Sequence, residues 1–186
     1  MRVSEHPLIW CLVFFLAGFS LSCASPLVLS NLAPFPVVKL NVEPYTQEPE
    51  KCGTSALAAV MDYLGKEADP EEMAQRLYLT GVRGTLTMDL FLEARRNGLD
   101  VTQGEGNFAG VRRDLASGYP LVLLVRYPAS KGDIGHYVVV NGFTDQPTGY
   151  FLLWGNGVES WMKESNLRKM WMRSGWWHLS FSGKSA

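Results

Sequence analysis

The sequence has few cysteines and histidines, and it lacks the motifs of several common enzyme classes. Three cysteines and three histidines occur in 186 residues, and there is no Cys-x-x-Cys or His-x-x-x-His pair. A structural zinc site needs about four such ligands, so the sequence predicts neither a metal site nor a cofactor. It also contains no glycine-rich phosphate loop after a strand and no Gly-x-Ser-x-Gly motif.

Charge of either sign is not in excess. The formal net charge is −1 and the pI is about 6.3, so no basic field indicates nucleic acid as a partner. Aromatic residues make up 12% of the chain and charged residues 19%. This composition is typical of a globular protein and excludes a disordered one.

A long hydrophobic run is also missing. The apolar segment near the start, Leu8 to Phe19, is too short to span a bilayer comfortably, and Arg2 precedes it, so residues 1–24 are predicted to be an export signal. Residues 20–23 resemble a lipobox, which would make Cys23 the acylated first residue of a bacterial lipoprotein; residues 22–24 instead fit ordinary signal-peptidase cleavage. We favour the lipoprotein, facing the periplasm from the cell envelope, over a secreted protein; a retained anchor helix is the third alternative.

The remaining chain of about 160 residues is long enough for one domain with a core. Four prolines, at positions 26, 34, 36 and 44, suggest an extended arm in residues 25–46, of which residues 25–41 are predicted to be a linker. It leads to a short strand near residues 37–42, and the folded domain is predicted over residues 42–183.

Cys52 is the only cysteine of that predicted domain, because Cys11 and Cys23 lie in or at the end of the signal. Exported proteins usually pair their cysteines, so a single thiol suggests a functional role. Apolar residues at helical spacing follow it as far as Leu64, and they predict a helix that begins near Cys52. The N–H groups and dipole at a helix start favour a thiolate. The alternative is a small buried hydrophobic residue.

Two neighbours of Cys52 fit an acyl-transfer site. Gln47 lies five residues upstream and can supply an amide donor, and Gly53 allows backbone or substrate to approach the sulfur. A nucleophile at a helix start with an amide donor beside it is suited to acyl transfer.

The other elements predict an α+β domain in which helices precede antiparallel strands. Helices are expected after Asp69, after Thr85 or Thr87, and after Asn107, each capped by the residue named. Strands are expected over residues 121–127, 136–143, 150–154 and 176–181, with a helix around 163–172 before the last strand.

The hairpin over residues 136–154 provides the second and third candidate catalytic residues. If its turn centres near residues 146–147, the numbers of opposed residues sum to about 292 or 293, and His136 faces Asn156 or its neighbours. Cross-strand neighbours lie about 5 Å apart, so Asn156 could orient the imidazole; Asp133 is the reserve. Cysteine as nucleophile, histidine as base and asparagine as orienting residue follow the logic of a thiol triad. His136 could instead bind a loop carbonyl, and His178, inside the last strand, is interpreted as structural.

Three segments together resemble the bacteriocin-processing, double-glycine-leader cysteine peptidases of the papain-like clan. They are Gln47 with Cys52-Gly53-x-x-Ala-Leu-Ala, Gly135-His136-Tyr-Val-Val-Val, and Gly155-Asn156-Gly157. The resemblance spans most of residues 42–181 and is closest to stand-alone exported or lipoprotein members. It implies a papain-like fold with N-terminal helices packed on an antiparallel sheet, and a Gly-Gly-like cleavage site. Cys52 would be the nucleophile, His136 the general base and Gln47 the oxyanion-hole donor.

The chain departs from that family pattern at three places. Thr54 replaces a common proline, Asn156 stands where transporter-linked members have an Asp followed by Pro, and Gln47 lies one residue closer to the cysteine than in some members. The sequence predicts a cysteine peptidase with peptide substrates and a membrane contact through Cys23. A transglutaminase-like acyltransferase and a peptide-binding module without catalysis are the alternatives.

Overall fold

The computed structural model describes residues 37–45, 48–130, 132–144, 149–155 and 157–183. All of them belong to one compact unit, Pro34–Ala186. The predicted signal with Cys23, and the site candidates Gln47 and Asn156, lie outside the described residues. Within the described ranges, no helix combines the length and the hydropathy that crossing a membrane requires.

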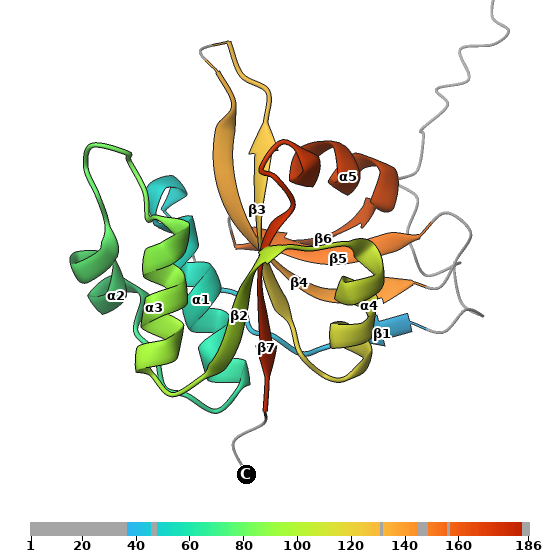
Figure 1. Cartoon of the computed structure of the whole chain (residues 1–186), viewed down its shortest axis with the longest axis horizontal. Helices are drawn as coiled ribbons and strands as arrows, with labels where there is room; N and C mark the ends of the chain where they lie inside the picture. Colours follow the sequence, from blue (N-terminus) through green and yellow to red (C-terminus); the bar gives the residue numbers. More distant parts are fainter. Residues whose placement is uncertain (1–36, 46–47, 131, 145–148, 156, 184–186) are drawn as a thin grey trace, which may run out of the picture. The chain divides into compact units, whose positions relative to one another are not determined.

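A single antiparallel sheet of seven strands forms the centre of this unit (Figure 1). The strand order is β2-β7-β3-β4-β5-β6, and β1 pairs separately with β4. The strands are β1 (Val37–Lys39), β2 (Asp100–Glu105), β3 (Leu121–Tyr127), β4 (Ile134–Thr144), β5 (Tyr150–Gly155), β6 (Val158–Lys163) and β7 (Trp177–Ser182).

Five α-helices and one 3₁₀ turn are described. They are η2 (Pro49–Lys51), α1 (Cys52–Tyr63), α2 (Pro70–Leu77), α3 (Thr87–Arg96), α4 (Phe108–Ala116) and α5 (Glu164–Met172). The predicted caps of α2 and α4 are confirmed, because the side chains of Asp69 and Asn107 accept hydrogen bonds from backbone N–H groups of the first turn. The predicted threonine cap of α3 is wrong: Leu86 occupies the N-cap and no side chain caps it.

The sheet separates two hydrophobic clusters because neighbouring residues of a strand point to opposite faces. Tyr137 and Val139 of β4 belong to the cluster that includes the buried face of α1. Val138 and Val140 belong to the cluster that includes residues of α4 and α5. Figure 1 shows α1, α2 and α3 on one side of β3, β4 and β7, and α4 and α5 on the other. Each face of β4 is therefore covered by different helices.

The α+β class is confirmed, but the expected order of helices before strands is wrong. Strand β2 lies between α3 and α4, and β6 lies between β5 and α5. Both occupy the ends of the strand order. In β2 only Val101 is buried, and every residue of β6 is at least partly exposed. Edge strands that bury so little carry a weak hydrophobic pattern, which is why the sequence did not reveal them.

Candidate active site

Cys52 is the first residue of α1 and follows the 3₁₀ turn η2 directly. Its side chain is 7% exposed, and it is the free cysteine of the described residues. A Cβ at Gly53 would lie 3.1 Å from the Tyr137 ring and would have to displace it slightly, so the glycine lets the start of α1 pack closely on β4. The first turn of the helix is thus held against the strand that carries His136.

The thiol does not gain the thiolate character that its position at a helix start predicted. Burial raises the pKa of Cys52, although the backbone N–H groups of Tyr137, Gly53 and Cys52 itself act in the opposite direction. Desolvation disfavours the charged form, and here it outweighs the helix start. In this arrangement Cys52 is a neutral thiol at neutral pH, which corrects the sequence-based expectation.

A cavity of about 550 Å³ opens beside Cys52. The loop that joins α2 to α3 forms one wall through residues 82–87, and β3 and β4 form another through Leu124, Arg126, Gly135 and Tyr137. The Tyr137 hydroxyl donates a hydrogen bond to the Thr85 carbonyl, at 3.0 Å, and so joins the two walls. The volume of this cavity falls within the usual range of ligand-binding pockets.

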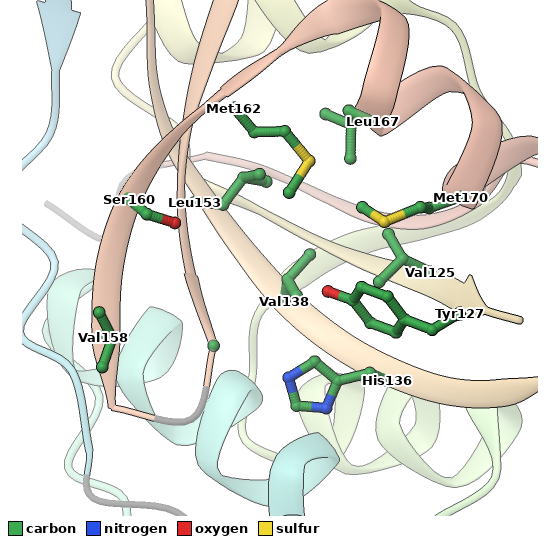
Figure 2. A pocket seen from close by; sticks show the side chains of 11 residues that line it. Val125, Tyr127, His136, Val138, Leu153, Val158, Ser160, Met162, Leu167 and Met170 are labelled. Carbon is green, nitrogen blue, oxygen red and sulfur yellow. The ribbon is translucent and has the colours of Figure 1, made fainter. Parts of the chain in front are cut away.

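His136 faces a different cavity. It shares its side of β4 with Val138, and together they line a pocket of about 110 Å³. Figure 2 shows the imidazole at one end of this pocket, with Met162, Leu167 and Met170 at the other. His136 is 8% exposed, and its Nε2 atom has no hydrogen-bond partner among the described residues.

The surroundings of the imidazole favour its neutral form. Burial lowers the pKa of His136, because a charged imidazolium loses its hydration in this pocket. A Cβ at Gly155 would lie 2.8 Å from Nε2, so the glycine leaves the space that the ring occupies. The next residue in the chain is Asn156, the predicted orienting residue.

The hairpin register agrees with the prediction. Val139 pairs with Trp154 and Val140 with Leu153, so the numbers of paired residues sum to 293 in this part of the hairpin. The reserve candidate Asp133 forms an ion pair with Arg173, with Nη1 and Oδ2 3.0 Å apart, and it lines the Cys52 cavity. The Nδ1–H of His178 donates a hydrogen bond to the Gly104 carbonyl, 2.9 Å away, in agreement with a structural role.

The structure therefore brings the Cys52 thiol and the β4 backbone together but leaves the thiol and the imidazole in separate cavities.

Two residues of the site were missed by sequence reasoning. Tyr137 follows His136 in the quoted motif, and strand alternation could have placed it toward α1. Arg126 ends an apolar strand pattern, and only the register with β4 places it beside Cys52. Across the described ranges, no group of three or more metal-ligating side chains occurs.

Comparisons with known proteins identify the fold and the family. The model of the Peptidase C39-like family matches residues 39–175, which is more than half of the chain. A solved Bacillus anthracis protein described as C39-like has a TM-score of 0.63 and 17% identity, covering 81% of this chain and 100% of that one. No curated protein matches the chain.

Two further solved structures are peptidase domains. The peptidase domain of Streptococcus ComA, a bifunctional ABC transporter of a quorum-sensing pathway, has a TM-score of 0.58 and 16% identity, covering 78% of this chain and 98% of that one. A double-glycine-motif protease from an AMS/PCAT transporter, in complex with the leader peptide, has a TM-score of 0.60 and 17% identity, covering 77% and 92%. At such identities the likeness shows the fold alone. The family match shows more: this chain belongs to the Peptidase C39-like family.

Proposed function

We propose that this member of the C39-like family is a cysteine peptidase, with Cys52 as nucleophile and His136 as general base. The observation that carries the proposal is the placement of Cys52: a free thiol at the start of α1 lines a cavity of about 550 Å³. The start of β4 lies against this thiol, as the hydrogen bond between the Tyr137 backbone N–H and the thiol indicates. Family membership supports a cysteine peptidase.

The pKa directions determine how the reaction would start. Burial keeps the Cys52 thiol and the His136 imidazole neutral, and a neutral imidazole is the form that can accept a proton. The thiol proton would move to His136 as sulfur attacks the peptide carbonyl. The proposal requires the start of β4 to rearrange so that the imidazole leaves the pocket of Figure 2 and reaches Cys52, because rotation of the side chain alone cannot carry it to the other face of the strand.

The later steps follow from the same residues. The Cys52 backbone N–H and the Gln47 amide would hold the oxyanion, and the protonated His136 would give its proton to the leaving amine. Water would then hydrolyse the acyl-enzyme. Asn156 would orient the imidazole, a role supported by the closeness of its chain neighbour Gly155, where an added Cβ would lie 2.8 Å from the unpartnered Nε2 atom.

The substrate is proposed to be a peptide. The transporter-derived relative was solved with its leader peptide bound, and the family resemblance suggests a cleavage site with small residues such as Gly-Gly. The test is to incubate the full chain with a proteome-derived peptide library that includes Gly-Gly sequences and to identify new N-termini by mass spectrometry. Cleavage should disappear in Cys52→Ser and His136→Ala; cleavage that persists in Cys52→Ser would overturn the assignment.

A peptide-binding module without catalysis is the second candidate. It is favoured by the separate cavities of thiol and imidazole and by the raised pKa of Cys52. Absence of new N-termini, together with retention of library peptides by the immobilised protein, would support it.

An acyltransferase would be recognised by adding an amine such as glycinamide and detecting transfer products in place of hydrolysis products.

We also propose, from the sequence alone, that the protein is exported and anchored through a lipid on Cys23. Metabolic labelling with an alkyne fatty acid in a bacterial host should tag the full chain and not Cys23→Ala. Release of untagged, cleaved protein into the periplasm or medium would instead indicate ordinary signal-peptidase processing.

A further inference from the structure

Arg126 is a charged side chain in the Cys52 cavity that the proposed reaction does not use. It lies on β3 opposite Gly135 of β4, and Leu124, two residues earlier, lies opposite Tyr137. All four residues line the cavity beside Cys52. Because Gly135 has no side chain, the space across from Arg126 on this face of the sheet is left to the cavity. Arg126 is partly buried as a residue.

The other charged groups of this cavity already have partners. Arg83 donates from Nε to Glu50, at 2.7 Å, and Asp133 is paired with Arg173. No ion pair or hydrogen bond joins Arg126 to any residue of the described ranges. Asp89 and Arg126 both act on the Tyr137 hydroxyl, with opposite effects on its pKa, yet Asp89 does not pair with Arg126. The described part of the cavity therefore carries one positive side chain without an ion-pair partner.

We infer that Arg126 makes the Cys52 cavity selective for substrates that carry a carboxylate close to the bond that is attacked. The planar guanidinium presents parallel N–H donors that match the two oxygens of a carboxylate. Binding such a group would compensate the charge of a partly buried arginine that has no ion-pair partner among the described residues. This inference names the substrate class for the proposed peptidase and so rests on that function, but the preference for anions beside Cys52 does not require catalysis.

Two alkylating probes of the same thiol measure this preference directly. Iodoacetate is an anion and iodoacetamide is its neutral counterpart, so the ratio of their rates at Cys52 reports the local preference for a carboxylate. Changes in the thiolate fraction affect both rates equally and cancel in the ratio. Trypsin cleaves after Lys51 and Lys66, so adducts can be followed in the full chain on peptide 52–66, which contains no other cysteine.

Removal of the charge should lower the ratio. In Arg126→Gln the iodoacetate-to-iodoacetamide ratio is expected to fall roughly fivefold at low salt, and added salt should reduce it in the wild type. Arg126→Lys should retain part of the preference. Arg95→Gln is the matched control, because Arg95 is exposed on α3 and does not line the cavity. A ratio unchanged in Arg126→Gln, or changed equally in Arg95→Gln, would overturn the inference.

Short peptides distinguish the two sources of a carboxylate. Acetyl-Gly-Gly-Glu-amide carries it on a side chain, and acetyl-Gly-Gly-Gln with a free C-terminus carries it on the main chain. Protection of Cys52 from iodoacetamide by one peptide, lost in Arg126→Gln, would identify the source. Protection by neither peptide would contradict the inference even if Cys52 proves to be the nucleophile. Loss of library cleavage in Cys52→Ser is measured separately, so the two proposals can fail independently.

Discussion

The two faces of β4 surround their reactive side chains in different ways. The face that packs on α1 holds Cys52 in a cavity of about 550 Å³ whose walls include charged side chains from a loop and from β3. The face that packs on α5 holds His136 in a pocket of about 110 Å³ that is lined mostly by apolar side chains, with Ser160 and Tyr127 as its hydroxyl groups. Tyr137 and His136 are consecutive residues, so one step along the strand separates the two environments.

Burial has opposite effects on the two pKa values but the same chemical consequence. The pKa of the thiol is raised and that of the imidazole is lowered, so both groups are held neutral. A preformed thiolate–imidazolium pair would need both shifts reversed. If Cys52 and His136 react together as proposed, the proton would move during the attack, and the start of β4 would have to rearrange to bring the imidazole to the Cys52 face.

The largest expected effect is on catalysis. Cys52→Ser should lower peptide cleavage by roughly a thousandfold or more, because the nucleophile is lost and the remaining groups act mainly through it. His136→Gln should have a similar effect if it acts on the same thiol. Cleavage rates should be measured beside urea unfolding midpoints, which show whether each variant still folds. Near-normal cleavage in His136→Gln would mean that the two faces do not cooperate.

A methyl group at Gly155 tests the His136 face alone. In Gly155→Ala the new Cβ would lie 2.8 Å from His136 Nε2 and 3.2 Å from a Val138 methyl carbon, so the imidazole must move, at a cost of about 1–3 kcal/mol in unfolding free energy. Gly135→Ala is the control, because its Cβ would meet only Leu124, at 3.5 Å. Chemical denaturation compares the two, and equal losses of stability would contradict the close contact.

Two tyrosines compare the hydrogen bonding of the faces. Tyr137→Phe should destabilise the fold by about 1–2 kcal/mol, because the Thr85 carbonyl loses a buried donor. Tyr127→Phe on the His136 face should cost less than about 0.5 kcal/mol, since its hydroxyl has no hydrogen-bond partner among the described residues and the side chain is 37% exposed. Urea unfolding of both variants checks this; equal losses would show that Thr85 is not anchored through Tyr137.

The smallest effects are those of pH on stability, one for each face. The folded pKa of His136 is lower than its unfolded value of about 6.5, so stability is full above that pH and is lost as pH falls through the folded pKa. The folded pKa of Cys52 is raised, so its contribution is full below about pH 8.5 and is lost as pH rises through the folded pKa.

These two limbs can be assigned by mutation. Unfolding midpoints measured from about pH 5 to about pH 9.5 should show a weaker acid limb in His136→Gln and a weaker alkaline limb in Cys52→Ser. Rapid alkylation of Cys52 below neutral pH would contradict the raised thiol pKa and restore the thiolate expected from the helix start.

Local patterns determined a large part of this protein. Asp69-Pro70 and Asn107 marked the starts of α2 and α4 because a capping side chain acts within one helical turn. The turn of the β4–β5 hairpin predicted its register to within one residue, since a short connection leaves few pairings. The family resemblance, carried by the segments around Cys52 and His136, agrees with the match over residues 39–175.

Other features were decided only by tertiary structure. The edge strands β2 and β6 have too few buried residues to leave a pattern and exist because β7 and β5 offer them backbone partners. The pKa of Cys52 rises because β4 and α1 exclude water from a helix start that would otherwise favour a thiolate. The face on which His136 lies depends on strand alternation combined with the packing of α1 on Tyr137. Sequence patterns report contacts within one or two turns. The desolvation of a side chain and the face of the sheet on which it lies depend instead on segments far apart in the chain.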